Sequence, residues 1–517
     1  MSELPESIQA MLDPQIYPEP IREVEMLQTQ MSFLFLTRNH VYKVKKAVNL
    51  GYLDYTTLSK RLFYCQREVE LNRRLCPKVY LGVVPLTKYR SKYFLEGKDK
   101  AVEYVVKMLR LPRFEMMDFL LENNRVTPQM VARVAQKMAE FHQRALTNNT
   151  ISVFGSLDTI IQNNEENFSQ TEKYIGGTIS QKQFQSLKDF TTGFIENNRA
   201  LFQERAAGGK IRDCHGDLHA AHVCFADDVC IYDCIEFNDR FRYCDVASEI
   251  AFMAMDLDHY GRADLSRHFV DAYIGQTQDN EIGQLLNFYK CYRAYVRGKV
   301  SSFKTADPYV GREEKKETEE TARSYFELAA SYARLRPLLL ITTGVTGTGK
   351  STLAQALAGR MGLVVLSSDV TRKQLAGVPL TEPHQEGFHD GIYTPEFSRK
   401  TYDRMFAEAA ELLDKGVSVI LDASFIKSED RRQAQKLAQS KKADFFLLHC
   451  VLDEENIKER LDERSKKDSV SDGRLEILSP QLERFDPITE VTAMKHIIVD
   501  SSFQLTTLVH YVLKAIG

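Results

Sequence analysis

The stretch L-L-L-I-T-T-G-V-T-G-T-G-K-S, residues 338–351, decides the fold of the C-terminal part of this chain. Six residues with strand character run directly into G-x-x-x-x-G-K-[ST], and a helical segment is predicted over 352–360. A glycine-rich turn between a strand and a helix places backbone N–H groups around a phosphate, and the helix N-terminus adds positive partial charge. The sequence therefore predicts a Walker A nucleotide-binding loop.

The Walker A pattern predicts a role for each of its side chains. Lys350 is expected to reach the β- and γ-phosphate oxygens of ATP, and the Ser351 hydroxyl to ligate Mg²⁺. ATP and Mg²⁺ are accordingly the predicted cofactors. The predicted nucleotide-contacting residues are Gly344, Gly347, Thr348, Gly349, Lys350, Ser351 and Thr352.

Strands and helices alternate along the rest of this C-terminal part. Predicted strands at 338–345, 363–367, 417–421, 445–452 and 496–499 are separated by helical segments. This alternation predicts a parallel sheet in a three-layer α/β/α domain. Such sheets place their sites at the carboxyl ends of the strands.

Candidate catalytic side chains follow these strands. Asp369 comes after the second strand and can accept a proton from an acceptor hydroxyl. Asp422 ends the third strand and is suited to holding Mg²⁺. Arg460 and Arg464 lie i, i+4 on a predicted helix, either as an arginine-bearing lid or as an ordinary salt-bridged helix.

With D-V-T-R at 369–372, this C-terminal part resembles the P-loop small kinases, in particular the polynucleotide 5′-kinase and zeta-toxin-like groups. The resemblance covers about 180 residues. It implies that Asp369 is the general base and that Arg372 helps to bind the acceptor.

The N-terminal part has a different pattern. Predicted strands at 31–36, 40–46, 80–87 and 102–108 surround a helix over 58–75, and a helical region extends from about 116 to 303. We therefore expect a small β-rich lobe and a larger α-rich lobe in a chain that mixes α/β and α+β domains. The predicted boundaries are an irregular leader at 1–23, a first domain at 24–305 (small lobe to about 108), a charged helical linker at 306–336 and a P-loop domain at 337–517.

The stretch H-G-D-L-H-A-A-H-V, residues 215–223, could be a metal cage or a phosphotransfer loop. No H-E-x-x-H or C-x-x-C pattern completes a metal site. Asp233 follows Asp217 by sixteen residues in an apolar segment that we predict as a strand, which is the layout of a kinase catalytic loop and its metal-binding aspartate. Lys43 on an early strand would contact the α- and β-phosphates, and Glu68 on the next helix would hold that lysine.

These residues give the N-terminal two-thirds a resemblance to the aminoglycoside phosphotransferase and choline-kinase-like family, which implies a bilobal protein-kinase-like fold. The whole chain resembles bacterial fusions of such a domain with a P-loop kinase. Family roles would pass to Asp217 as base, Asp233 for Mg²⁺, and Lys43 with Glu68 at the phosphates.

Two features depart from the family pattern. His222 stands where the family has a second metal-binding asparagine, and no glycine-rich loop precedes Lys43. Lys45 lies on the same strand face as Lys43, so either lysine could contact the phosphate. Ser32 remains a weak candidate for a phosphate contact.

Two further patterns carry smaller expectations. Asp245 is expected to cap the following helix. Basic residues at 293, 297 and 299 are interpreted as a solvated helix face, with an anionic-acceptor site as the alternative.

Composition sets the remaining expectations. The chain has 517 residues, a net charge of −3 and nine cysteines. We find no signal-peptide pattern, membrane-spanning run or basic field for nucleic acid, so we expect a cytoplasmic protein with free thiols. The expected partners are small-molecule hydroxyl substrates, and the oligomeric state stays open.

The favoured function is a bifunctional ATP-dependent kinase. The alternatives are a P-loop enzyme regulated by a ligand-binding pseudokinase domain, and a metal-dependent hydrolase at the three histidines.

Overall fold

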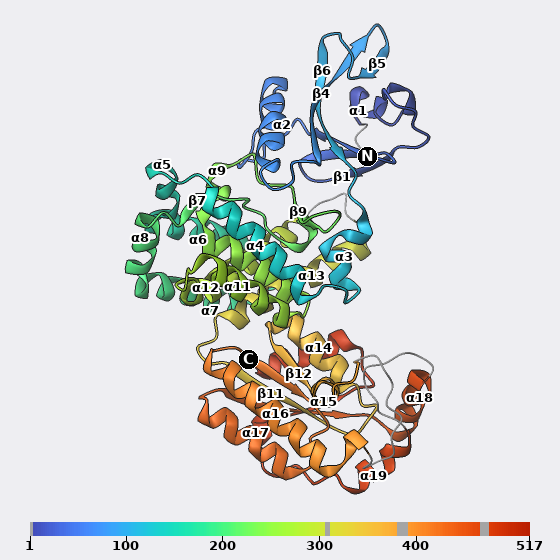
Figure 1. Cartoon of the computed structure of the whole chain (residues 1–517), viewed down its shortest axis with the longest axis vertical. Helices are drawn as coiled ribbons and strands as arrows, with labels where there is room; N and C mark the ends of the chain where they lie inside the picture. Colours follow the sequence, from blue (N-terminus) through green and yellow to red (C-terminus); the bar gives the residue numbers. More distant parts are fainter. Residues whose placement is uncertain (1–3, 306–310, 380–390, 466–474, 517) are drawn as a thin grey trace. The chain divides into compact units, whose positions relative to one another are not determined.

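The computed structural model describes residues 4–305, 311–379, 391–465 and 475–516 (Figure 1). The chain forms two compact units. The first comprises residues 1–256 and 267–323, and the second comprises residues 257–266 and 324–517. The helix α13 (Arg312–Tyr332) is divided between them, so the segment that we expected to be a separate linker contributes residues to each unit.

The first unit begins with a six-stranded antiparallel sheet in the order β1-β2-β3-β6-β4-β5. The helix α2 (Leu58–Asn72) follows β3, starting at Thr57, whose hydroxyl accepts from Lys60 N. The strands are β1 (Glu25–Gln28), β2 (Ser32–Leu36), β3 (His40–Lys45), β4 (Tyr80–Tyr89), β5 (Lys92–Leu95) and β6 (Ala101–Leu109).

The two faces of this sheet are covered by different segments. Alternation along β6 sends Val106 to the side of α2 and Val105 to a core formed with the N-terminal segment. That segment contains α1 (Glu6–Ala10) and the short 3₁₀ helix η1 (Pro14–Ile16). The segment that we expected to be an irregular leader thus contains two short helical stretches, and its buried side chains pack on the sheet.

A helical lobe follows the sheet. Two short two-stranded sheets interrupt it, pairing β7 (Ile211–Asp213) with β10 (Tyr243–Asp245) and β8 (Val223–Cys224) with β9 (Cys230–Ile231). Its helices are α3 (Met117–Glu122), α4 (Pro128–Arg144), α5 (Asn149–Ser152), α6 (Leu157–Thr171), α7 (Gln181–Asn197), α8 (Arg199–Ala207), α9 (Asp239–Arg242), α10 (Val246–His259), α11 (Ala263–Thr277) and α12 (Ile282–Thr305).

The segment after β9 corrects two expectations. The strand ends at Ile231, and Asp233 adopts a left-handed φ of 63°, so the predicted strand does not reach Asp233. Cys76 and Cys230 form a disulfide across a Cα–Cα distance of 4.8 Å. The expectation that every thiol is free was wrong at this pair, because residues 154 positions apart in sequence meet in the fold.

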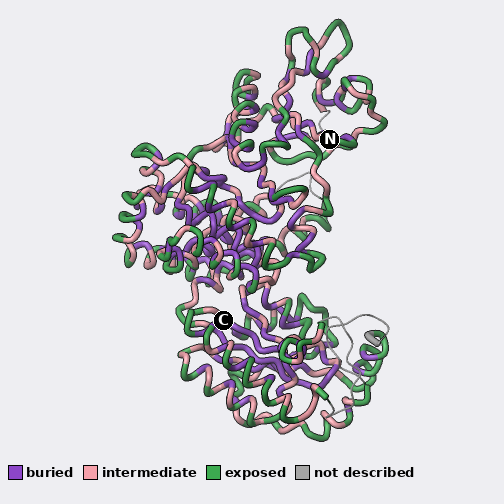
Figure 2. Tube along the Cα trace, viewed as in Figure 1, coloured by how far each residue is buried: buried purple, intermediate pink, exposed green. Residues whose placement is uncertain are grey.

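The second unit has a five-stranded, fully parallel sheet in the order β12-β13-β11-β14-β15. Its strands, β11 (Leu338–Thr343), β12 (Val364–Ser367), β13 (Val419–Asp422), β14 (Asp444–Val451) and β15 (His496–Asp500), lie at the five predicted places. The strands β11 and β13 are buried along their whole length, as expected for a sheet covered on both faces, whereas the edge strand β15 exposes Ile498 (Figure 2).

Helices cover both faces of this sheet and complete three layers. On one side α14 (Lys350–Met361) and α20 (Leu505–Ile516) share a core with the strands, and on the other α16 (Pro395–Asp414) and α17 (Ser428–Ser440) do so. The remaining helices are α15 (Ser368–Ala376), α18 (Glu454–Ser465) and α19 (Leu478–Glu483). The second unit therefore has the predicted mixed α/β architecture with a parallel sheet.

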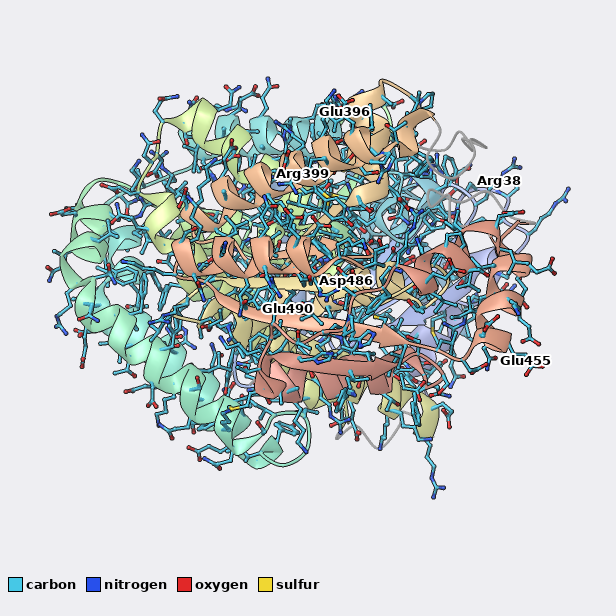
Figure 3. All side chains as sticks on the ribbon, turned by 90° about the horizontal axis from the view of Figure 1, so that it is seen from below. Arg38, Glu396, Arg399, Glu455, Asp486 and Glu490 are labelled. Carbon is cyan, nitrogen blue, oxygen red and sulfur yellow. A yellow bond between two sulfur atoms is a disulfide. The ribbon has the colours of Figure 1, made fainter. Side chains whose placement is uncertain are left out.

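A buried arginine ties α17 to the segment after α19. Arg431 is fully buried, pairs with Glu490 and donates to the Asp486 carbonyl at 3.0 Å; both acidic residues are labelled in Figure 3. These contacts satisfy a buried charge, which would otherwise be costly. Among the described residues of both units, no helix has the length and apolar character needed to cross a bilayer.

Candidate functional site

The Walker A loop of the second unit connects β11 to α14. Gly344, Gly347 and Gly349 have φ values of 138°, 80° and 79°. A side chain is strained at such angles, and a Cβ on Gly347 would lie 3.0 Å from Ile457 Cγ2. The conformation of the loop thus depends on glycine at these positions. Thr348 is buried and its hydroxyl donates to Val345 O, so it braces the loop from within.

The loop groups that could contact a phosphate form hydrogen bonds to other protein atoms in this structure. Lys350 Nζ donates to Val345 O at 2.7 Å, and Thr346 N donates to Gln481 Oε1 at 2.7 Å. Ser351 and Thr352, in the first turn of α14, line a cavity of about 810 Å³.

Acidic and basic side chains from other elements line the same cavity. Burial raises the pKa of Asp422 against a hydrogen bond from Ser351 and the charge of Lys350. Asp369 also lines the cavity, but from the first turn of α15 rather than from the end of a strand. The P-loop, Asp369 and Asp422 thus meet around one space.

The predicted arginines differ in their placement. Arg372 lines the cavity, donates to Ile392 O at 2.9 Å and to Ser398 Oγ at 3.1 Å, and lies over the ring of Tyr393. Arg460 also lines it and donates to Ser501 O at 2.7 Å. The side chain of Arg464 lies outside the described residues.

In the first unit two lysines share one carboxylate. Glu68 is fully buried on α2 and pairs with Lys43 at 2.8 Å and with Lys45 at 2.6 Å. Lys43 also reaches Asp233 Oδ1 at 2.7 Å and lines a cavity, whereas Lys45 is 1% exposed and pairs with Glu236. The structure therefore places Lys43 at the cavity and Lys45 behind it.

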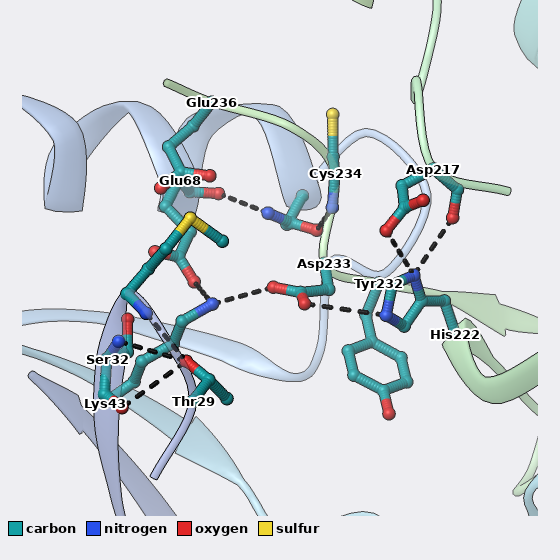
Figure 4. Close-up of polar contacts among 12 residues, drawn as sticks. Thr29, Ser32, Lys43, Glu68, Asp217, His222, Tyr232, Asp233, Cys234 and Glu236 are labelled. Carbon is teal, nitrogen blue, oxygen red and sulfur yellow. Dashed lines mark hydrogen bonds and ion pairs between the residues drawn. The ribbon is translucent and has the colours of Figure 1, made fainter. Parts of the chain in front are cut away.

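His222 lies between the two predicted aspartates (Figure 4). Its Nδ1 lies 3.0 Å from the Asp217 carbonyl and 3.5 Å from Asp217 Oδ2, and its Nε2 lies 3.6 Å from Asp233 Oδ2. Burial, then the neighbouring His219, lowers the pKa of His222 to about 4. With Nδ1–H donating to the carbonyl, the neutral ring turns an Nε2 lone pair toward Asp233.

Both aspartates stay ionised. Burial opposes ionisation, but His219 and His222 hold the pKa of Asp217 below its usual value, with a contribution from Arg297. Burial is likewise outweighed at Asp233, where Lys43 and then His222 lower the pKa. An ionised Asp217 can accept a hydrogen bond from a substrate hydroxyl.

Buried groups that we did not predict hold this loop. Glu249, on α10, accepts from His215 N at 3.0 Å and from Gly216 N, and lies 2.8 Å from His142 Nε2. Asp256 of the same helix accepts from Ala220 N at 2.9 Å. The signal was present as acidic residues within the apolar run V-A-S-E-I-A-F-M-A-M-D, because buried carboxylates require partners.

Gly216 is part of the same support. Its φ is 88°, and a Cβ there would lie 3.0 Å from Phe241 O. Asp245, in contrast, accepts from Ala247 N at 2.8 Å and pairs with Arg205, which confirms that it caps α10.

The cavity of the first unit has a volume of about 1110 Å³ and is lined by Lys43, Asp217 and Asp233. Ser32 and the turn before it also line it. That turn has no glycine, and the Thr29 hydroxyl accepts from Ser32 N at 3.0 Å and from Met31 N at 3.3 Å (Figure 4). Thr29 therefore holds this turn at the cavity, a role that we did not predict.

The three histidines do not form one cage. His215 Nε2 lies 2.9 Å from Tyr232 O, and its Nδ1 accepts from Asp217 N. Within the described chain, the ligand atoms that gather are those of Asp217, His219 and His222. A second buried group, His142 with Cys214 and Glu249, is part of the hydrogen-bonded support described above.

Comparison with known proteins gives a family match for the second unit. Residues 339–488 match the family model AAA_33, described as an AAA domain. Together with the Walker A geometry, this match identifies the C-terminal domain as a P-loop domain.

Longer matches come from two mycobacteria. Uncharacterized proteins of Mycobacterium tuberculosis (strain ATCC 25618 / H37Rv) and Mycobacterium bovis (strain ATCC BAA-935 / AF2122/97) are each 29% identical over 432 residues, covering 83% of this chain and 83% of theirs. Their similarity therefore extends across both units.

Two solved kinases match part of the chain. A gluconokinase from Sinorhizobium meliloti 1021 is 24% identical, with a TM-score of 0.25, over 35% of this chain and 93% of its own. The Mycobacterium tuberculosis APS kinase CysC in complex with AMPPNP and APS is 18% identical, with a TM-score of 0.25, over 35% of this chain and 98% of its own.

Proposed function

We propose that this protein is a bifunctional ATP-dependent phosphotransferase whose two units each transfer a γ-phosphoryl group to an alcohol. The first unit would be a protein-kinase-like domain of the aminoglycoside phosphotransferase type, and the second a P-loop small-molecule kinase. The observation that carries the proposal is the pair of cavities: Lys43, Asp217 and Asp233 line one, and Lys350, Asp369 and Asp422 line the other.

The donor sets fit a divalent cation. In the first unit Asp233 Oδ2 and the free Nε2 of His222 face one another at 3.6 Å, and in the second Ser351 lies against a buried Asp422 whose pKa is raised. A cation would relieve that unfavourable burial of negative charge. When bound with ATP, it supplies charge neutralisation on the phosphate oxygens.

The residues of the chain supply the remaining chemistry. An acceptor hydroxyl hydrogen-bonded to Asp217, or to Asp369 in the second unit, is oriented toward the γ-phosphorus and gives up its proton. The acceptor oxygen forms the new P–O bond while the bond to the β-phosphate oxygen breaks. Lys43 and Lys350 would release their present partners, Asp233 and Val345 O, to meet the phosphates.

Two variants separate the units. In Asp217→Asn the first site should lose at least a hundredfold in turnover, and in Lys350→Ala the second should, while the double variant loses all ATP-dependent transfer. Consumption of γ-labelled ATP with a metabolite extract as the acceptor source measures each loss. Unchanged total transfer in Asp217→Asn would remove the first centre from the proposal.

A second candidate for the first unit is a nucleotide- or ligand-binding pseudokinase that regulates the P-loop domain. It is favoured by His222 at a metal position and by the glycine-free Thr29 turn. Under this alternative Asp217→Asn leaves turnover at the P-loop centre within twofold, and Lys350→Ala alone abolishes ATP consumption.

A further inference from the structure

The cavity of the first unit has an acceptor end that is rich in positive charge. Its wall there comes from α6, α9 and α12 rather than from the antiparallel sheet. Apart from Lys43, Asp217 and Asp233, the basic residues that line the cavity are Lys173, Arg240, Arg293, Arg297 and Lys299, and the carboxylates are Glu166, Glu172, Glu236 and Asp245.

A chain of contacts orders the cavity from one end to the other. Lys43 contacts Asp233, His222 lies between Asp233 and Asp217, and Arg297 lies close enough to Asp217 to lower its pKa. In this series Lys43 contacts the Asp233 end, and the charge of Arg297 acts on the Asp217 end. Under the proposed function Asp217 meets the acceptor hydroxyl, so the charge of Arg297 acts on the acceptor side.

Three of these carboxylates are paired with cations: Glu166 with Arg240, Asp245 with Arg205 and Glu236 with Lys45. Glu166 receives both terminal nitrogens of Arg240, at 2.8 and 2.6 Å, a bidentate pair. Arg293 and Lys299, in the described chain, have no carboxylate within ion-pair distance. Arg293 and Lys299 therefore add positive charge to this wall that a ligand can meet.

Lys299 is held by neutral groups. Its Nζ donates to Asn167 Oδ1 at 2.6 Å and to Gln170 Oε1 at 2.8 Å, both on α6. Burial lowers the pKa of Lys299 to about 8, with Glu166 opposing and Arg240 adding to the shift. A partly buried ammonium among amides is stabilised by an arriving anion.

Arg293 is 7% exposed and joins the helix that carries Lys299 to the loop that carries Asp217. It donates to Gly216 O at 3.2 Å and to Ser248 Oγ at 3.2 Å, so α12 is bonded to the loop that carries Asp217. The interpretation of this face as solvated was wrong at Arg293, which is buried, and the side chains of Arg297 and Lys299 line the cavity with it.

We propose that the first unit accepts small alcohols that carry a phosphate or carboxylate group, with the anion held by Arg297 and Lys299 and the hydroxyl presented to Asp217. This inference rests on the proposed function for the role of Asp217. Its basis, a cationic subsite bonded to the catalytic loop, is independent of turnover.

The test is calorimetric titration of the full chain saturated with AMPPNP and Mg²⁺, which fills any nucleotide phosphate sites beforehand. The probes are glycerol 3-phosphate, glycerate and glycerol. We expect at least one of the two anions to bind, glycerol not to bind, and Lys299→Gln to weaken the anion about tenfold. The two anions distinguish phosphate from carboxylate recognition.

Matched variants locate the effect. Lys304→Gln removes a lysine of the same helix that is exposed and does not line the cavity, so it should change anion affinity less than twofold. Lys299→Arg keeps the charge and should retain binding. An equal loss in Lys304→Gln, equal binding of glycerol, or no binding of either anion would overturn the inference.

The nucleotide stoichiometry separates this outcome from the proposed function. Two AMPPNP bound per chain agree with two kinase centres. If the wild type binds one AMPPNP and the Lys350→Ala variant binds none, the first unit does not bind nucleotide. The anion subsite is then judged alone, from the Lys299→Gln and Lys304→Gln affinities.

Discussion

At the scale of single residues, His222 is the side chain that most affects the metal site we propose for the first unit. Its imidazole contacts both aspartates and keeps one nitrogen available toward Asp233. Imidazole nitrogen is a poorer partner for Mg²⁺ than for softer divalent ions such as Mn²⁺. The side chain therefore predicts a metal preference that an asparagine would not.

We predict that His222→Asn shifts this preference toward Mg²⁺. The ratio of Mn²⁺ to Mg²⁺ affinity in the first unit should fall about tenfold, because an amide oxygen replaces the ring nitrogen. Mn²⁺ titration followed by electron paramagnetic resonance, with Mg²⁺ as competitor and AMPPNP present, measures the ratio in a Lys350→Ala background. A ratio that rises or stays constant contradicts the assignment of His222 as a ligand.

Some residues of the candidate sites can be predicted from the sequence, and others cannot. The Walker A glycines, and the order of Asp217, His222 and Asp233, are local patterns whose geometry follows from short-range backbone constraints. Glu249 and Asp256 anchor the same loop across more than thirty residues, and no spacing rule marks them. What reveals them is their charge within an apolar helix, which is a physical rather than a motif signal.

At the scale of elements, the strands were easier to predict than the contacts between segments far apart in the sequence. The alternation of strand and helix predicted the five strands of the parallel sheet, because each buried strand must be apolar along its length. The N-terminal segment and the Cys76–Cys230 pair were missed for a common reason. Each depends on a contact with sequence-distant residues, which composition and periodicity do not encode.

The disulfide leads to a stability prediction. Linking residues 154 apart restricts the unfolded chain, which the chain-entropy model values at about 5 kcal/mol. Dithiothreitol should lower the unfolding midpoint of the first unit, measured by differential scanning calorimetry. A Cys76→Ser, Cys230→Ser double variant should unfold at the reduced midpoint with or without reductant.

Thiol counting provides the control. Seven cysteines are free in the structure, so seven of the nine should react with an alkylating reagent in denaturant without reductant. Nine reactive thiols would show that the pair is not joined in the purified protein.

At the scale of the whole molecule, the two units do not divide where the charge pattern changes. The second unit includes residues 324–332 of α13 and the segment 257–266. Within it, Tyr332 donates to Asp258 Oδ2 at 2.6 Å, and Glu327 pairs with Arg360 at 2.6 Å. A cut at residue 337 therefore removes part of the core of this unit.

We predict that a fragment of residues 324–517 is more stable than one of residues 337–517. The longer fragment keeps the Glu327–Arg360 pair and buried side chains such as Phe326 and Leu328. The difference should appear as a midpoint several degrees higher in thermal denaturation followed by circular dichroism. Equal midpoints would show that the end of α13 adds nothing to the second unit.

The helix α12 has a consequence for how such a protein can diversify. Arg293 bonds to Gly216 in the loop that carries Asp217, whereas Lys299, six residues further along, lines the cavity that we propose to bind the acceptor. Exchanges at position 299 can therefore retune molecular recognition without disturbing the machinery held by position 293. In relatives that act on a different acceptor, we therefore expect substitutions in the turn of α12 around position 299.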